Sequence, residues 1–143
     1  MLQACAKLDV AFVPFLPVGR GIFAQENPDP ANFRETDFRK DTPRFPEPNF
    51  GYNVAKVNAF KALAQDLGTH PTSLAIALCL HHGPHLIPIP GTRSSAHLTQ
   101  CADASKFMMS AEIMTQIETV LPVGWAHGDR YTKAQWNGPE GYC

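Results

Sequence analysis

Apolar residues recur every three or four positions in five stretches of the chain, and this spacing predicts amphipathic helices. The stretches lie at about residues 2–8, 54–67, 71–80, 96–106 and 110–121. Gly68 ends the second helix, Pro71 occupies a first-turn position that tolerates proline, and Ser110 is a suitable N-cap for the last helix. The chain is therefore expected to be rich in helix.

Two short apolar runs have the composition of strands that are buried on both faces. Residues 10–15 read Val-Ala-Phe-Val-Pro-Phe, and residues 86–90 read Leu-Ile-Pro-Ile-Pro. Pro14 counts against a central position for the first run, because proline cannot donate to a ladder and fits better at the end of a strand. Each run precedes a loop and then a helix, an alternation that predicts an α/β fold with a parallel sheet.

Composition narrows the class of protein without identifying it. The 143 residues are 44% hydrophobic and carry a formal net charge of -1, as expected for one domain with its own core. No basic stripe favours nucleic acid or an anionic membrane as a partner, and no apolar run approaches the roughly 20 residues of a membrane span. The cysteines are scattered without CxxC spacing and no signal peptide is visible, so we expect a reduced, cytoplasmic chain without a metal centre.

Two glycine-containing loops follow the predicted strands, at the end where parallel α/β folds bind ligands. In the first, residues 15–21, glycine allows the backbone to approach a phosphate, and Arg20 adds positive charge. The second, residues 89–95, leads into a helix N-terminus that attracts anions, and Arg93 with neighbouring hydroxyls supplies further donors. Both loops also fit a simpler interpretation as tight turns that need glycine, and composition alone does not separate the two.

Several segments, in this order, closely resemble the C-terminal part of bacterial and fungal aldo-keto reductases. Residues 13–21 look like the aromatic-Ser-Pro-Leu-Gly-Arg-Gly segment after that family's seventh barrel strand, and residues 87–93 look like its phosphate-binding segment after the eighth. Further similar segments are Asp37-Phe-Arg39 with Pro43-Arg-Phe45, Thr72-Ser-Leu-Ala-Ile-Ala77 and Gly128-Asp-Arg-Tyr131. The resemblance covers nearly the whole chain, and several motifs in the family's order are hard to attribute to coincidence.

The resemblance implies an α/β fold, namely the C-terminal portion of a (β/α)8 TIM barrel. Residues 1–143 would supply its last two strand–helix units, with a long proline-rich loop at residues 24–52 and a C-terminal tail at residues 122–143. A closed barrel of this kind needs about 250 residues, so we expect the barrel to be open. Long loops of this type are often lids or binding loops.

The family binds NADP(H) and reduces aldehydes or ketones, so the resemblance implies a dinucleotide along the two loops. Phe15 stands where the family stacks an aromatic ring on the nicotinamide, and residues 17–21 stand where it lines the pyrophosphate. Residues 91–94 match the segment that holds the adenosine 2′-phosphate, the group that distinguishes NADP from NAD. The implied cofactor-binding residues are Phe15, Pro17, Val18, Gly19, Arg20, Gly21, Gly91, Thr92, Arg93, Ser94, His97, Gln100 and Cys101.

Four positions on this surface depart from the family pattern. Leu16 stands where a serine usually contacts the cofactor, and His97 stands where an arginine often adds charge. Gln100 and Cys101 replace the common Glu-Asn pair that holds adenine, and a thiol is a poor substitute for an amide. These departures predict weaker cofactor binding than the family pattern would give.

The resemblance implies no catalytic residue within this chain. The family's catalytic Tyr, Lys, Asp and His lie in the first half of the barrel, and this sequence matches the part that follows them. We therefore expect the chain to be inactive alone, and to act on a small carbonyl substrate only with a complementary N-terminal half. Open sheet edges also predict self-association. A non-catalytic dinucleotide-binding or regulatory module is the alternative function.

Two other patterns suggest chemistry but have simpler explanations. Tyr52 and Lys56 have the Tyr-x-x-x-Lys spacing of short-chain dehydrogenases, yet no glycine-rich dinucleotide fingerprint precedes them. His81, His82 and His85 lie close in sequence, but adjacent helical side chains diverge by about 100° and no acidic ligand is near. We interpret the first pattern as accidental and the second as a solvated helix end.

Overall fold

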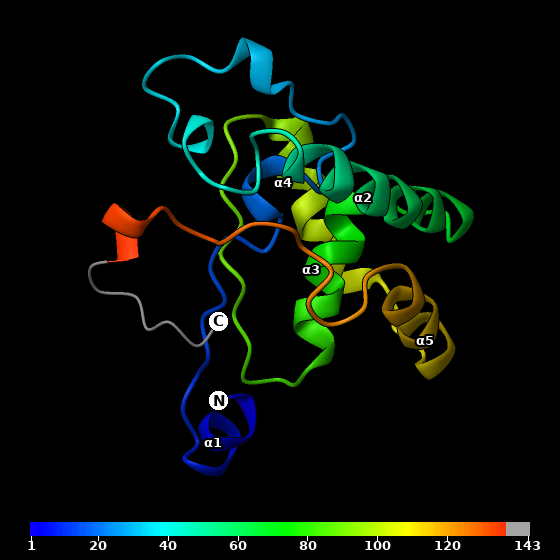
Figure 1. The fold of residues 1–143 in the computed structure, drawn as a ribbon. Coiled ribbons are helices and arrows are strands. Elements are labelled where there is room, and N and C mark those ends of the chain that lie inside the picture. Colours follow the sequence, from blue (N-terminus) through cyan, green and yellow to red (C-terminus); the bar gives the residue numbers. More distant parts are fainter. Residues whose placement is uncertain (137–143) are drawn as a thin grey trace.

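The described part of the chain, residues 1–136, is mostly helical in the computed structural model (Figure 1). Its α-helices are α1 (Leu2–Lys7), α2 (Asn49–Asp66), α3 (Pro71–His81), α4 (Ser95–Asp103) and α5 (Ala111–Val120). Short 3-10 turns form at η1 (Gly19–Gly21), η2 (Pro30–Asn32), η3 (Phe38–Lys40), η4 (Ala104–Lys106) and η5 (Lys133–Trp136). Each α-helix overlaps a stretch that the hydrophobic spacing predicted, so the helix predictions are confirmed.

Helix ends follow the sequence signals at two places. Ser110 caps α5, because its hydroxyl accepts a hydrogen bond of 3.2 Å from the Ile113 N–H. After α2 the chain turns at Gly68, whose φ of +68° suits glycine better than any other residue. The helix predicted for residues 96–106 is divided, since α4 ends at Asp103 and η4 completes the stretch.

The start of α2 differs from the prediction. The Glu47 carboxylate accepts a hydrogen bond of 3.2 Å from the Gly51 N–H, and satisfies one of the donors that the first turn leaves without a partner. The helix therefore begins at Asn49 instead of residue 54. The first four residues of α2 belonged to the predicted loop of residues 24–52, so that loop is shorter than expected.

The core lies around α3, which runs through the middle of the helical part in Figure 1. Its first seven residues, Pro71 to Ala77, are all buried. One side of α3 packs against α2 and α5 in a cluster formed by Phe60, Ala64, Leu74, Ala75 and Ile117. The other side packs Ile76 and Ala77 against Ala104 of η4. Burial of each large apolar side chain stabilises the fold by about 1.5–3 kcal/mol, so α3 is the main anchor of the described chain.

The predicted strands form only a minimal pairing. Residues 10–15 and 86–90 run side by side in the parallel direction, as the blue and green extended segments in Figure 1 show. Two isolated bridges join them, between Phe12 and Leu86 and between Phe15 and Ile89. The parallel direction agrees with the prediction, but no continuous strand forms within residues 1–136. The prolines of both runs lack an N–H, and this limits the ladder.

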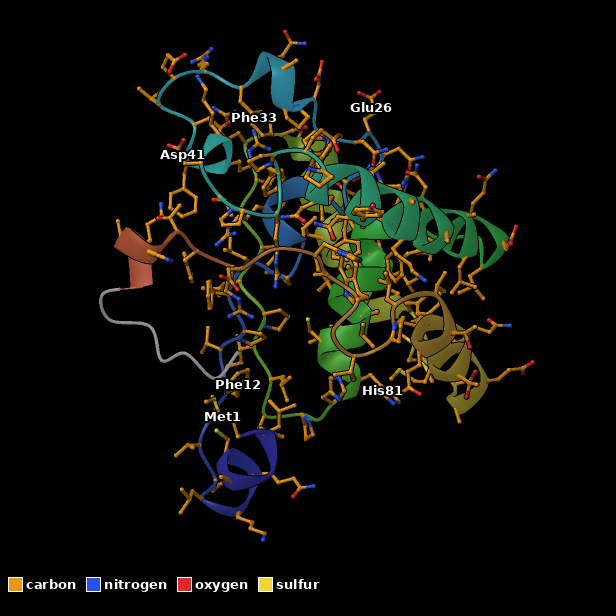
Figure 2. The ribbon with its side chains drawn as sticks, viewed as in Figure 1. Met1, Phe12, Glu26, Phe33, Asp41 and His81 are labelled. Carbon is orange, nitrogen blue, oxygen red and sulfur yellow. The ribbon has the colours of Figure 1, made fainter. Side chains whose placement is uncertain are left out.

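Burial of these two segments was predicted on both faces, and this prediction is wrong for the described residues. Phe15 is 50% exposed, and Ile87 and Ile89 are each 54% exposed. Leu86 alone among residues 86–90 is buried, at 5% exposed. Phe12, which Figure 2 labels, lies in the extended stretch that follows α1, and no further strand of residues 1–136 flanks either segment. Several apolar side chains of the two segments therefore remain exposed to solvent within residues 1–136.

The tail is held to the rest of the chain by the amide of Asn53, a residue of α2 that is only 1% exposed. Its Nδ2 donates to the carbonyls of Arg44, at 3.1 Å, and His127, at 3.0 Å. Its Oδ1 accepts a hydrogen bond of 2.8 Å from the His127 N–H. We call these three hydrogen bonds the Asn53 clasp. Next to the clasp, a Cβ at Gly128 would lie 2.5 Å from the Pro43 carbonyl oxygen, so only glycine allows this close approach. Residues 137–143 of the predicted tail lie outside the described residues.

We expect Asn53→Ala to lower the free energy of unfolding by about 2–4 kcal/mol, because the buried Asn53 amide and its hydrogen bonds to three backbone groups are lost. The matched control is Asn58→Ala, on the same helix, where the hydrogen bond with Asn27 is exposed. Asn58→Ala should lower the free energy of unfolding by no more than about 0.5 kcal/mol. Urea unfolding followed by circular dichroism measures both values, and equal losses in the two variants would contradict the clasp.

Candidate functional site

The two glycine-containing loops converge on one cleft with a volume of about 830 Å³. The first loop forms one side, and the second loop with the start of α4 forms the other. The parallel bridges at the bases of both loops place them next to each other. Nine of the thirteen predicted cofactor-binding residues line this cleft, namely Val18, Gly21, Gly91, Thr92, Arg93, Ser94, His97, Gln100 and Cys101.

Two buried hydroxyls at the start of α3 hold the two sides of the cleft in place. Thr72 donates from Oγ1 to the carbonyl of Phe23, just after the first loop, at 3.3 Å. Ser73 donates from Oγ to the carbonyl of Gln100 in α4, at 2.7 Å. The two residues are 6% and 1% exposed, and buried hydroxyls are costly to leave without a partner. The core helix therefore fixes the separation of the two loops.

The second loop leaves donors free at the entry to α4. The hydroxyl of Thr92 is used within the loop, since it accepts from the Ser94 N–H at 3.2 Å. Ser94, at the N-cap position, makes no side-chain cap to the first turn of the helix. Arg93 is exposed and takes part in none of the ion pairs of residues 1–136. Uncapped first-turn N–H groups beside an unpaired arginine suit a phosphate.

Part of the cleft comes from the long loop of residues 24–52, which the sequence analysis described as a type that often forms lids or binding loops, but whose residues it did not assign to the cofactor. Residues 24–28 and Arg39 contribute a third wall, and Figure 2 labels Glu26 from this wall and Phe33 from the same long loop. Arg39 donates to the Asp37 carboxylate from Nε at 3.0 Å and from Nη2 at 2.7 Å. The sequence contained a signal for this pair, because Asp37-Phe-Arg39 is one of the family-like segments.

Arg39 also ties the long loop to the first glycine loop. Its Nη1 donates to the Arg20 carbonyl at 3.3 Å, and its guanidinium lies 4.2 Å from the centre of the Phe33 ring. Hydrogen bonds from the Arg39 side chain and backbone lower the pKa of the Asp37 carboxyl from 3.8 to about 2. These contacts hold the Arg39 side chain at the third wall of the cleft.

Arg20 was predicted to add charge for a phosphate, but its side chain does not line the large cleft. It faces a smaller cavity of about 140 Å³, which Phe15 and Gly19 also line. Its Nη1 donates to the Arg130 carbonyl at 2.8 Å. Its guanidinium lies beside two neighbouring aromatic rings, 5.1 Å from the centre of Phe38 and 5.0 Å from that of Tyr131. These contacts direct Arg20 toward the tail.

The other chemical patterns of the sequence lie away from both cavities. Tyr52 is 57% exposed and stacks on the His127 ring at 4.8 Å, and it lines neither cavity. His81 and His82 are exposed at the end of α3. Within residues 1–136, no group of three or more His, Cys, Asp or Glu side chains is placed to hold a metal ion. No helix in the same range is long and apolar enough to cross a membrane.

The fold is similar to part of a solved barrel enzyme. The structure of the glycerol dehydrogenase AKR11B4 from Gluconobacter oxydans superimposes with a TM-score of 0.76, over 85% of this chain and 37% of that chain, at 22% identity. The described fold therefore corresponds to part of a TIM-barrel fold.

Sequence comparison identifies the family. The pattern of the Aldo/keto reductase family matches residues 1–122, and the chain belongs to that family. The chain is 29% identical over 131 residues to aldo-keto reductase yakc [NADP(+)] of Schizosaccharomyces pombe, covering 92% of this chain and 38% of the relative. It is 27% identical to aldo-keto reductase str7 of Strobilurus tenacellus, covering 91% of this chain and 39% of that protein. The chain thus spans about two-fifths of the length of these relatives.

The Asp37–Arg39 pair gives a titration that can be measured. We expect Asp37 to titrate at about 2 in the folded chain, and Arg39→Gln to return its pKa toward 3.8. Because the folded-state pKa is depressed, the contribution of the pair to stability is complete above 3.8 and is lost as the pH falls through about 2.

Carboxyl ¹³C chemical shifts followed by NMR report this titration. Arg34→Gln is the control, because it removes an exposed arginine from the same loop and should leave the pKa of Asp37 near 2. An Asp37 pKa that does not respond to Arg39→Gln would show that the pair does not set it.

Proposed function

We propose that this chain carries the cofactor-binding part of an NADP(H)-dependent aldo-keto reductase, which reduces aldehydes or ketones. The observation that carries the proposal is the convergence of both glycine loops and α4 on one cleft of about 830 Å³. A relative whose name includes NADP(+) is similar over 92% of this chain, and this supports the choice of cofactor.

The chemistry of the cleft fits a phosphate-bearing ligand. Gly91 opens onto free space, since a Cβ built there would have no atom within 4 Å. The uncapped first turn of α4 and the exposed Arg93 offer donors to a doubly charged group such as a 2′-phosphate. We assign Arg93, Ser94 and the first turn of α4 to the 2′-phosphate, and Gly21 with Val18 to the pyrophosphate side.

The chain offers contacts of different quality to the two ends of the dinucleotide. Phe15 presents a half-exposed ring suited to stacking on the nicotinamide. At the adenine end, burial raises the pKa of the Cys101 thiol, which keeps it neutral and leaves it a weak hydrogen-bond donor. Gln100 is the better partner for adenine there. We therefore propose tight contacts at the 2′-phosphate and looser ones at the base.

The reaction needs a group that the two cavities do not contain. NADPH supplies the hydride when it is bound, and the developing alkoxide needs a proton from a nearby acid. Neither cavity has a tyrosine or a lysine among its lining residues. We propose that the acid comes from another part of the barrel, as the relatives' greater length allows.

The exposed segments of residues 10–15 and 86–90 are the proposed contact with that part. Their outward apolar side chains and free edges favour pairing with further strands. A complementary N-terminal half is one partner that satisfies them, and a second copy of this chain is the other. Both would cover apolar surface that residues 1–136 leave in contact with water.

A non-catalytic dinucleotide-binding module is the second candidate function. The absence of tyrosine and lysine from the linings of both cavities favours it. The two functions differ in one outcome, because a binding module would remain inactive even when the first half of a related reductase is added.

The cofactor assignment predicts a preference for NADPH over NADH. Charge-assisted hydrogen bonds contribute about 1.5–3 kcal/mol each, so the preference should be tenfold or more, and Arg93→Ala should reduce it by about tenfold. Calorimetric dissociation constants for both dinucleotides measure the preference, and Arg34→Ala is the control for loss of charge alone. Equal affinities for the two cofactors would refute the assignment of Arg93.

The catalytic proposal predicts that the chain alone does not oxidise NADPH in the presence of aldehydes. General-acid catalysis typically contributes about 10²–10⁴-fold, and oxyanion stabilisation contributes a comparable factor. A panel of aromatic and aliphatic aldehydes should give no turnover until a separately expressed first half of a related reductase is added. Turnover by the chain alone that disappears in Tyr52→Phe would instead make Tyr52 the acid.

A further inference from the structure

Three arginines from distant parts of the sequence surround the smaller cavity of about 140 Å³. Arg20 comes from the first glycine loop, Arg44 from the end of the long loop and Arg130 from the tail. Arg44 and Arg130 also line a second cavity, of about 390 Å³, on the side of the tail. Arg44 and Arg130 therefore line both cavities.

No carboxylate forms an ion pair with these cations within the described residues, although Asp129 lines the second cavity beside Arg44 and Arg130. The ion pairs of residues 1–136 involve none of the three arginines. Arg20 is engaged by the Arg130 carbonyl and by two aromatic rings, whereas Arg44 uses only its Nε, which donates to the Gly128 carbonyl at 3.2 Å. The Arg130 guanidinium makes no hydrogen bond in this range and lies 5.9 Å from the centre of the Phe15 ring.

Holding these charges together is unfavourable in the structure as it stands. The three residues are partly buried. Burial lowers the pKa of Arg44, the charges of Arg130 and Arg20 lower it further, and Asp129 offsets them only in part. Like charges in a partly desolvated site repel more strongly than in water, and a bound anion would relieve this repulsion.

Apart from Asn53, the rest of the cavity is apolar. Phe15, Phe45 and Trp125 contribute aromatic walls, and Ile22 and Phe23 add to them. A small inorganic ion would leave these walls without a partner. A molecule with a flat apolar body and an anionic group at one end satisfies both the walls and the arginines.

We propose that Arg44 and Arg130 form a subsite for the carboxylate of an acidic carbonyl substrate, whose apolar body packs against Phe15 and Trp125. The inference rests on the proposed function, because Phe15 is the residue assigned to the nicotinamide. The planar fork of arginine matches a carboxylate in two parallel hydrogen bonds, and two such forks give selectivity over a neutral aldehyde. Arg93 plays no part in this subsite, since it lines the large cleft instead.

Calorimetric titration of the full chain with 4-carboxybenzaldehyde and with benzaldehyde tests the subsite. The acidic aldehyde should bind at least about tenfold more tightly than the neutral one. Arg130→Gln should abolish most of this difference in affinity. The native Arg130 side chain makes no hydrogen bond within residues 1–136, so its replacement should leave the fold intact. Arg34→Gln is the matched control, and Arg44→Lys, which keeps the charge without the fork, should lose part of the preference.

Parallel titrations with NADPH separate this inference from the proposed function. If NADPH does not bind, but the acidic aldehyde is still preferred and Arg130→Gln removes the preference, the cofactor proposal fails and the subsite stands. Equal binding of both aldehydes, or an Arg130→Gln variant that behaves like Arg34→Gln, overturns the subsite. A loss of NADPH affinity in Arg130→Gln as large as its loss for the acid also overturns it, because the cations would then serve the phosphates of the cofactor.

Discussion

The cleft depends on two hydrogen bonds from the first turn of α3. The hydroxyls of Thr72 and Ser73 each donate one hydrogen bond and make no other within residues 1–136, and each bond reaches one side of the cleft. Because Ser73 is only 1% exposed, its hydroxyl cannot exchange its protein partner for water without opening the core. The stability of the core and the geometry of the cleft are therefore coupled, and a weaker core would also be a looser binding site.

The sequence predicted the helices better than the sheet, for a physical reason. An amphipathic helix satisfies its own backbone, and its apolar spacing alone identifies the buried face, as in α5. A strand needs neighbours, and the runs at residues 10–15 and 86–90 have only each other within the described chain. Their composition predicted a buried environment, which residues 1–136 do not provide. The start of α2 was missed because the cap comes from Glu47, a side chain that precedes the helix.

The sequence predicted the site residues whose position the backbone of a loop sets. It predicted less well the residues whose long side chains can contact several different partners. Gly91 and Arg93 face the cleft because the loop and the start of α4 place them there. Arg20 also belongs to a family-like motif. Its guanidinium nevertheless contacts two aromatic rings and a carbonyl outside the large cleft. The aromatic partners Phe38 and Tyr131 are far from Arg20 in sequence, so no local pattern could reveal that choice. Arg39 did have a local signal, the family-like Asp37-Phe-Arg39 segment, but nothing in that signal placed it in a wall of the cleft.

The clasp at Asn53 has a consequence for how the chain folds. It joins residues 74 positions apart, and neighbouring contacts join residues 84 and 110 positions apart. Closing such long loops is entropically expensive, so these contacts form after the local helices have associated. A contact that is absent from the transition state affects mainly the rate of unfolding. The clasp therefore acts as a kinetic lock, which sets how long the tail stays docked and hardly changes how fast the helical core assembles.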